Sequence, residues 1–371
     1  MPILLDLLIY TLFSAVFVQS IYHIFIFGRF PLIDHSTQDS KKKRVSVIIC
    51  AKNEADNLLK NIPHLLSQKH PDFELVLIND SSKDNTLSVM LKFKKQDSRI
   101  KIVDVKPVDA FWGNKKYALT LGIKAASNDI LLFTDADCVP NSDDWVNQMC
   151  SLVTENKKLV LGYSPYQKIK GSFLNQLIRF ETFMTALQYF SYAKFGQPYM
   201  AVGRNLAYKR ELFFEANGFI KHIKIKSGDD DLFVNQMANK TNTALCVNPK
   251  SFVKSIPKTS FKDWVRQKRR HISTAKFYKP RHKVMLGLYY ISQLLFWLSA
   301  FSLIVFLHLW KIVLIVIIFR FLVQYAVFYK SAKKLQELDL LYLLPLTELS
   351  LIVFQFYIFI NNLISKPRHW K

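Results

Sequence analysis

Long apolar stretches occupy both ends of the chain and frame a middle part in which short apolar runs alternate with polar ones. The first stretch runs from Ile3 to Phe27 and is interrupted by Asp6, Gln19, His23 and a few hydroxyl side chains. A helix that spans a bilayer needs about 20 apolar residues, so this stretch is long enough to cross one. Because no basic segment precedes it, we expect a retained anchor rather than a cleaved signal peptide.

The C-terminal apolar region is long enough for more than one crossing. Its first part, Val284 to Tyr329, exceeds the length of a single spanning helix, and a break near His308–Lys311 would give two helices. A last segment, Leu338 to Ile364, contains Pro345 and Glu348. Three arrangements stay open for that segment: a crossing, a re-entrant hairpin, or a position in the membrane interface.

The charge balance is strongly basic, with 51 Lys and Arg against 28 Asp and Glu and a formal net charge of +23. Such a surplus is typical of proteins that meet nucleic acid, an anionic membrane face or a phosphorylated substrate. No nucleic-acid-binding motif occurs among the basic stretches, so we expect membrane lipids as partners and no nucleic acid. Arg29 and the run Lys41 to Arg44 follow the first apolar stretch, which predicts a multi-pass protein of the cell (inner) membrane with its middle domain in the cytoplasm.

The middle part shows the periodicity of alternating strands and helices. Short β-rich runs are followed each time by a segment with helical spacing, which predicts an α/β domain with a mostly parallel sheet. The expected strands are Val45–Cys50, Phe73–Asn79, Ile100–Val105 and Ile130–Thr134, and the expected helices are Glu54–Leu66, Asn85–Phe93 and Lys115–Ala126. We expect three parts: an anchor over 1–28, the α/β domain with interfacial helices over 44–276, and transmembrane or re-entrant helices over 284–364.

Polar residues cluster directly after the expected strands. Asn53 and Glu54 follow the first strand, Asp80 follows the second, and Asp135 and Asp137 follow the fourth. In parallel sheets the carboxyl ends of the strands meet at one edge, and ligands bind there. A turn or helix-cap role is the alternative for Asp80 and its neighbours.

Asp135 and Asp137 are carboxylates separated by one residue at a strand end. Such a pair can share one hard cation, and Mg²⁺ and Mn²⁺ bind carboxylates together with phosphate oxygens. The sequence therefore predicts a Mg²⁺ or Mn²⁺ site at Asp137 and Asp135, where the metal would act as a Lewis acid on a leaving diphosphate.

A second acidic cluster spans Gly228 to Leu232 and includes Asp229 and Asp230. Adjacent carboxylates raise one another's pKa, which would suit a general base. The alternative is an acidic first turn of a helix, and both roles are compatible.

Two basic segments are candidates for binding phosphate. Lys115 lies in the segment Trp112–Lys116 that opens the third expected helix. Gln267 and Arg270 lie in an amphipathic basic run, where the alternatives are contact with lipid headgroups or closure over a diphosphate by a mobile helix.

Taken together, the motifs resemble the family-2 glycosyltransferases, whose catalytic domain has the GT-A fold. The resemblance covers Val45 to Lys276. The order of its motifs is the specific part. An opening strand with an Asn-Glu turn is matched by Val45–Glu54, an Asp-Gly-Ser-like stretch by Asn79–Thr86, and a Gly-Lys-x-x-Ala-Leu-like stretch by Gly113–Leu119. A DxD follows at Asp135–Asp137, and a Glu-Asp-x-Asp-Leu-like stretch at Gly228–Leu232.

The resemblance implies roles for these residues. Asn53, Glu54, Asp80 and Lys115 would bind a nucleotide-diphosphate sugar donor, as would Asp135, Gln267 and Arg270, with metal at Asp137 and Asp135. Alignment on Asp231-Leu232 places the catalytic base at Asp229, with Asp230 as the alternative. The resemblance thus implies an inverting, metal-dependent hexosyltransferase.

Membrane-bound synthases of cellulose, hyaluronan and poly-N-acetylglucosamine share the flanking helices and a Gln-x-x-Arg-Trp pattern. Here Gln267 and Arg270 match that pattern, and His271 replaces the tryptophan that helps to bind the acceptor. We therefore expect transfer to a lipid-linked or membrane-associated glycan acceptor in cell-envelope glycan synthesis. The alternative is a processive polysaccharide synthase that also exports its polymer. The apolar run Phe173–Phe195 is interpreted either as core packing or as an interfacial helix leading the acceptor to the site.

Overall fold

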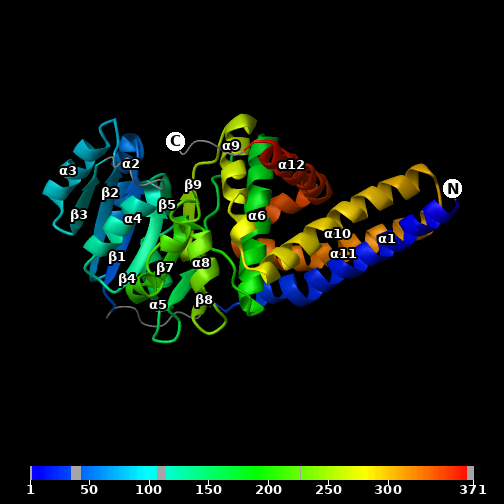
Figure 1. The fold of residues 1–371 in the computed structure, drawn as a ribbon, viewed down its shortest axis with the longest axis horizontal. Helices are drawn as coiled ribbons and strands as arrows, with labels where there is room; N and C mark the ends of the chain where they lie inside the picture. The colour runs from blue at the N-terminus through cyan, green and yellow to red at the C-terminus, as the bar shows by residue number, and fades with distance from the viewer. Residues whose placement is uncertain (1, 35–42, 107–113, 226, 366–371) are drawn as a thin grey trace.

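The structure is a computed structural model that describes residues 2–34, 43–106, 114–225 and 227–365. Trp112 and Gly113, to which the sequence assigned part of a phosphate-binding segment, lie outside the described residues, as do the basic residues after position 365. The described chain forms a globular α/β part and a long helical rod that extends from one side of it (Figure 1).

The α/β part is built on a seven-stranded sheet with the strand order β3-β2-β1-β4-β7-β6-β8. The first four of these strands in the chain are parallel, as predicted. They are β1 (Val45–Ala51), β2 (Phe73–Asp80), β3 (Ile100–Val105) and β4 (Ile130–Asp135), connected by α2 (Ala55–Leu66), α3 (Thr86–Gln96) and α4 (Asn114–Ala125).

Alternation along these strands divides the core into two layers. Val47 and Ile49 of β1 pack with Leu58 of α2 in one buried cluster. Ile48, between them, points to the other face and packs with Ile123 of α4 in a second cluster. Successive side chains of a strand point to opposite faces, so a strand that is apolar throughout requires a helix layer on each side.

The other three strands of the sheet were not predicted, and one of them, β7, runs antiparallel to the first half. β7 (Leu206–Lys209) pairs antiparallel with β4 and with β6 (Leu159–Leu161), and β6 pairs parallel with β8 (Thr243–Leu245). A separate two-stranded sheet joins β5 (Cys138–Pro140) to β9 (Val253–Ser255). Three short helices, α5 (Trp145–Ser151), α7 (Arg210–Glu215) and α8 (Asp231–Met237), connect these strands.

Two helices separate the sheet from the rod. α6 (Phe173–Lys194) and α9 (Phe261–Ile272) stand across the end of the rod in Figure 1, and α12 (Leu344–Ile364) packs beside them. Most of α6 is buried, on more than one of its faces, because it contacts elements on both sides. The predicted helix over Phe173–Phe195 is therefore confirmed, and the described contacts favour the core-packing interpretation for most of its side chains.

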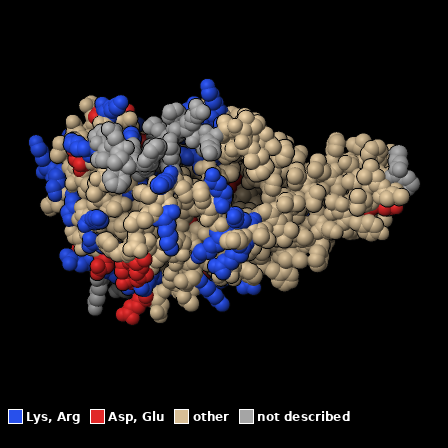
Figure 2. Space-filling view, viewed as in Figure 1, with Lys and Arg blue, Asp and Glu red and all other residues tan. Residues whose placement is uncertain are grey.

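The rod consists of α1 (Pro2–Ile21), α10 (Pro280–Val305) and α11 (Trp310–Leu335). The predicted break in the second apolar region is confirmed, because α10 and α11 are joined by a turn at residues 306–309. Together with the segment Leu338–Ile364, the described residues contain four helices long and apolar enough to cross a membrane. On the face shown in Figure 2, the blue Lys and Arg side chains lie on the globular part and at the base of the rod.

The polar residues that interrupt the apolar stretches meet inside the helical part. Arg320 of α11 forms an ion pair with Glu348 of α12 and donates to Gln19 of α1 at 2.8 Å. Gln293 of α10 donates to Glu348 at 2.8 Å. Buried charges are stable only when paired and hydrogen-bonded, so this cluster fixes the relative positions of all four helices.

Candidate functional site

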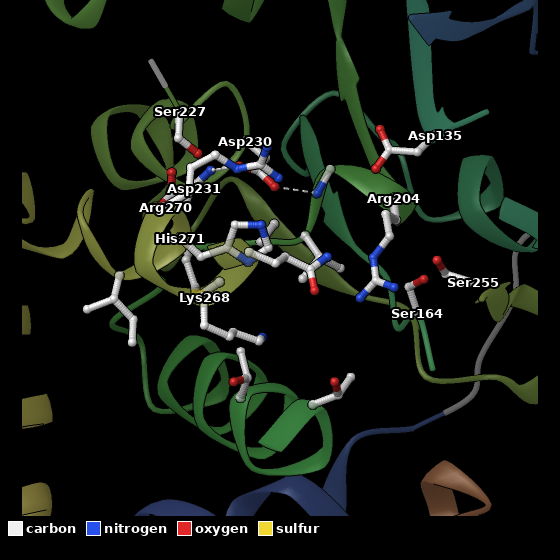
Figure 3. Close-up of a pocket in the computed structure, with 18 of the residues that line it drawn as sticks. Asp135, Ser164, Arg204, Ser227, Asp230, Asp231, Ser255, Lys268, Arg270 and His271 are labelled. Atoms are coloured by element: carbon white, nitrogen blue, oxygen red, sulfur yellow. Dashed lines mark hydrogen bonds between the residues drawn. The ribbon is translucent and has the colours of Figure 1, made fainter. Parts of the chain in front are cut away.

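A cavity of about 850 Å³ opens at the carboxyl ends of β1, β2 and β4. Strand-end residues, among them Asp80 and Asp135, line it. Segments of α9 and α6 lie across the cavity from Asp135 (Figure 3). The volume of the cavity lies within the range of about 300–1,000 Å³ that is typical of ligand sites. All predicted site residues except Asn53 line it: Glu54, Asp80, Lys115, Asp135, Asp137, Asp229, Asp230, Gln267 and Arg270.

Asn53 lies beside the cavity and holds two loops together. Its backbone has φ 55°, in the left-handed region. Its side-chain oxygen accepts from the backbone N–H of Lys83 at 2.8 Å, and its own N–H donates to Ser82 at 3.0 Å. The structure thus ties the turn after β1 to the turn after β2 through Asn53.

Asp80 lies at the end of β2, where its carboxylate lines the cavity. It is 2% exposed, and burial raises the pKa of its carboxyl group. Lys52 lies 4.0 Å from its Oδ2, and that oxygen has no hydrogen-bond partner among the described residues. A buried acceptor without a donor is costly unless a ligand supplies one.

Asp135 and Asp137 form a candidate metal site. Together with Cys138 they bring ligand atoms within 4.8 Å of one another. Burial raises the pKa of the Cys138 thiol well above its usual value, and the thiol donates to Asp137 at 3.4 Å. The protonated thiol is not a metal ligand. The two carboxylates remain as hard oxygen donors, which fit Mg²⁺ or Mn²⁺.

Lys115 links the two acidic clusters. Its Nζ lies 3.3 Å from Asp135 and 2.9 Å from Asp229. Burial alone would lower the pKa of Lys115, but these two carboxylates outweigh it and raise the pKa well above the usual value. Residues 115, 135 and 229, far apart in sequence, therefore meet in one electrostatic cluster.

The three consecutive aspartates have different environments. Burial raises the pKa of Asp229, but the ion pair with Lys115 outweighs it and leaves the pKa below its usual value. Burial and the charges of Asp229 and Asp231 raise the pKa of Asp230 to about 7. Asp231 is 7% exposed and accepts from Thr274 and Tyr278. Asp231 therefore holds the cluster to the segment after α9.

Two glycines allow the backbone to approach this cluster. The N–H of Gly203 donates to Oδ2 of Asp230 at 2.6 Å, and a Cβ at Gly203 would lie 3.1 Å from that oxygen. Gly228 has φ +91°, a conformation that L side chains rarely adopt. The Gly228 position, where the resembled motif has Glu, therefore serves the turn into α8.

Lys116 anchors the segment in front of the acidic cluster and was missed in the sequence. It is 2% exposed, and its Nζ donates to the carbonyls of His222, Ile225 and Ser227 at 2.7–2.9 Å. Burial lowers the pKa of Lys116 to about 8, so the amine is mostly protonated at neutral pH and can donate three hydrogen bonds.

The helix α9 is fixed at several points along its length. Trp264 stacks on Phe354 of α12 with ring centroids 3.8 Å apart. Lys268 lies 2.5 Å from Glu181 of α6, and Arg269 donates to Asn362 at 3.0 Å. In this conformation α9 is thus held against α6 and α12. The sequence left two roles open for this helix, contact with lipid headgroups and closure over a diphosphate.

Gln267 and Arg270 face the cavity from α9. Gln267 donates to Tyr166 at 3.4 Å. Burial lowers the pKa of Arg270, and the aspartates of both acidic clusters oppose that effect. In Figure 3, Arg270, Lys268 and His271 lie on one side of the cavity and Arg204 on the other.

Residues 46–215 match the family model described as Glycosyl transferase family 2. A poly-beta-1,6-N-acetyl-D-glucosamine synthase of Staphylococcus epidermidis is 32% identical over 143 residues, which cover 37% of this chain and 33% of that protein. A probable glycosyltransferase of Bacillus subtilis is 25% identical over 181 residues, 46% of this chain and 43% of that protein. The chain thus spans about a third of the length of the synthase that it matches.

A solved structure resembles nearly the whole chain. The mannosyltransferase PcManGT from Pyrobaculum calidifontis, in complex with GDP-Man and Mn²⁺, superimposes with a TM-score of 0.60 at 17% sequence identity. The match covers 90% of this chain and 99% of that chain. At this identity the likeness concerns the fold, and it confirms the expected GT-A architecture with a mostly parallel sheet and flanking apolar helices.

Proposed function

We propose that this chain, whose residues 46–215 match the model of the family-2 glycosyl transferases, transfers a sugar from a nucleotide-diphosphate sugar to a lipid-linked or membrane-associated acceptor, with inversion at the anomeric carbon. One observation carries the proposal. Residues from five separate segments, Asp80, Lys115, Asp137, Asp229 and Arg270, line a single cavity.

Donor binding would use the strand-end wall and α9. The unpartnered, buried oxygen of Asp80 fits an N–H or O–H of a nucleoside. Lys115, which lies between the acidic clusters, and Arg270, whose charge is coupled to both, supply positive charge for a diphosphate. A guanidinium can bind two phosphate oxygens at once, which suits Arg270 for this role.

Asp135 and Asp137 would hold Mg²⁺ or Mn²⁺. A divalent ion there supplies Lewis-acid stabilisation of the departing diphosphate. Of the acidic cluster, Asp229 occupies the motif position of the base, and Asp230 is the alternative. Since a general base works best with a pKa near the operating pH, the value of about 7 favours Asp230 electrostatically.

The proposed topology places the α/β part in the cytoplasm and lets α1, α10 and α11 cross the membrane. The last apolar helix, α12, has both ends held by the globular part. Arg179 of α6 binds Asp339, just before α12, at 2.7 Å, and Arg269 of α9 donates to Asn362 near the end of α12. We therefore place α12 in the interface, without a full crossing.

Cysteine labelling tests this topology. Leu307→Cys, in the turn at the far end of the rod, should react in intact cells with a maleimide that does not cross the membrane. Ser365→Cys should react only after permeabilisation. Reaction of Ser365→Cys from outside would contradict the interfacial placement of α12.

For the acceptor, single transfer is favoured over processive synthesis and export. His271 replaces the tryptophan of the Gln-x-x-Arg-Trp pattern. Three crossing helices are also few for enclosing a channel through which a polymer could pass. Chain length of the product made from a radiolabelled donor separates the two: one added sugar supports single transfer, and a ladder of products supports the synthase.

A donor screen tests the proposed function directly. The full chain in detergent is incubated with a panel of nucleotide sugars and Mn²⁺ or Mg²⁺, and release of nucleoside diphosphate is measured. We expect metal-dependent turnover that falls about 100-fold in Asp137→Asn, a loss of about 3 kcal/mol in transition-state stabilisation. Asp143→Asn is the matched control, because Asp143 pairs with Lys69 on the surface. Equal turnover in wild type and Asp137→Asn would refute the site.

A further inference from the structure

Arg204 lines the cavity, and neither the proposed donor binding nor the proposed metal site assigns a role to its guanidinium. It belongs to the short turn Gly203–Asn205 that leads into β7. Its guanidinium lies over the ring of Tyr166, 4.5 Å from the centroid. Its Nη1 is buried and has no hydrogen-bond partner in the part of the chain that the structure describes. A buried donor without an acceptor indicates a ligand that supplies one.

The guanidinium extends away from Asp135, although its charge is still coupled to Asp135 and Asp137. In Figure 3 it points from the Asp135 side toward the part of the cavity where Ser164 and Ser255 lie. Ser255 is 3% exposed on β9 and lines the same cavity. Arg204 and Ser255 thus offer a planar cation and a hydroxyl on the wall opposite Arg270.

The backbone places Arg204 next to Asp230, one of the two candidate bases. Gly203, its neighbour, donates its N–H to Asp230 at 2.6 Å. The acceptor hydroxyl must come within hydrogen-bond reach of that base, about 2.6–3.2 Å. The turn that carries Arg204 therefore borders the acceptor side of the reaction centre.

The same cavity continues to the membrane helices. Leu286 of α10 and Phe354 of α12 line it, and both helices are apolar enough to lie in a bilayer. Thr182 and Tyr189 of α6 line the same cavity. An amphiphile can therefore place its chain against α10 and α12 and its polar group near Arg204.

We propose that Arg204 binds a phosphate group of a lipid acceptor, next to the hydroxyl that receives the sugar. The assignment rests on the proposed glycosyltransferase function. A guanidinium matches two phosphate oxygens in one plane, and the Ser255 hydroxyl is available to a third. The stacking on Tyr166 holds the guanidinium in place before the ligand arrives.

Ligand-dependent melting of the full chain in detergent tests this site without requiring turnover. The probes are farnesyl phosphate, farnesol and inorganic phosphate, each titrated to obtain an affinity. We expect wild type to bind farnesyl phosphate at least about 10-fold more tightly than farnesol, since a hydrogen bond to a charged group is worth about 1.5–3 kcal/mol. Arg204→Met should bring the ratio close to one, and Arg204→Lys should keep part of it.

Arg44→Met is the matched control and should keep the ratio, because the Arg44 side chain is 72% exposed and pairs with Asp72 at the surface. Should Arg204→Met fail to fold, Arg204→Lys decides by the same ratio. A ratio unchanged in the Arg204 variants overturns the proposal. Inorganic phosphate binding as tightly as farnesyl phosphate overturns its lipid part.

Saturating nucleoside diphosphate with Mn²⁺ should leave the preference for farnesyl phosphate intact, because the two anions occupy different walls. If the preference disappears, Arg204 serves the donor and the proposal is wrong. The donor screen is independent of these titrations. A failed screen with an intact Arg204-dependent preference would refute the glycosyl transfer and leave the phosphate site standing, and the reverse result would refute the site alone.

Discussion

The raised pKa of Asp230 can be tested by its effect on folding stability, independently of any role of Asp230 in catalysis. Its pKa rises from 3.8 to about 7, because burial and the adjacent Asp229 and Asp231 disfavour the carboxylate more than Lys115 favours it. Arg270 of α9 is a further cation whose charge is coupled to this carboxylate. The pKa in the unfolded chain stays near the usual value, so folding stability is full below about pH 4 and falls as pH rises toward 7.

The perturbation is Asp230→Asn. The amide is neutral at every pH and resembles the protonated acid. Asp230 caps the start of α8, where its carboxylate accepts from the N–H of Asp231 at 2.8 Å. Asn is as good as Asp at such a position. The variant and wild type should therefore melt alike only near pH 4 and below. A pKa rise of about three units corresponds to roughly 4 kcal/mol, which is the upper limit of the advantage that the variant gains above pH 7.

The assay is thermal melting of both proteins in detergent from pH 4.5 to 9. The variant should melt higher by several degrees at pH 8, at about 2–4 °C per kcal/mol, and the difference should grow from the acid end of the range and level off near pH 7. Ser260→Ala, a cap at the start of α9 that accepts from Asp263 N–H, is a control whose effect should not depend on pH in this range. A difference between Asp230→Asn and wild type that is flat across the range would refute the raised pKa.

Kinetics then assign the base. Removal of a general base costs about 10²–10⁴-fold in rate. If Asp230 is the base, Asp230→Asn loses that factor and the wild-type rate rises with pH through about 7. If Asp229 is the base, Asp229→Asn shows the loss and the acid limb lies at lower pH, because the pKa of Asp229 is held below its usual value.

Three further predictions concern the frame of the site. Arg320→Met should lower stability by about 3–5 kcal/mol by leaving Glu348 buried and unpaired, and adding Glu348→Leu should restore most of it, measured by melting in detergent. Trp264→Ala should lower the melting temperature and release α9 from Phe354, at a cost of about 3–5 kcal/mol; an unchanged melt would show that the stack contributes little. Lys116→Met should speed proteolysis within residues 222–227 by about 10-fold, since three carbonyls lose a charged donor; equal cleavage rates would contradict the anchoring role.

Local pattern was sufficient for the first half of the sheet and for the break in the second apolar region. Apolar runs such as Ile130–Thr134 carry the information for a buried strand in their own residues, and motif spacing identified Asp80, Asp135 and Asp137 at strand ends. The antiparallel strand β7 could not be predicted, because the pattern of its four residues is no more strand-like than that of many loops. Its place in the sheet depends on β4, about 70 residues earlier in the chain.

The sequence by itself determined the order of secondary structure over 45–135, the acidic and basic motifs, and the apolar segments, because each depends on residues close together in the chain. Only the tertiary structure decided how distant residues meet. In the structure Asn53 does not line the cavity and joins two loops instead, whereas Arg204 does line it. Lys116 donates hydrogen bonds to the segment before Gly228. The tertiary structure also held both ends of α12 against the globular part through Arg179 and Arg269, which apolar length alone cannot reveal. The physical reason is that burial, pairing and pKa depend on neighbours in space, and those neighbours are set by the packing of the whole chain.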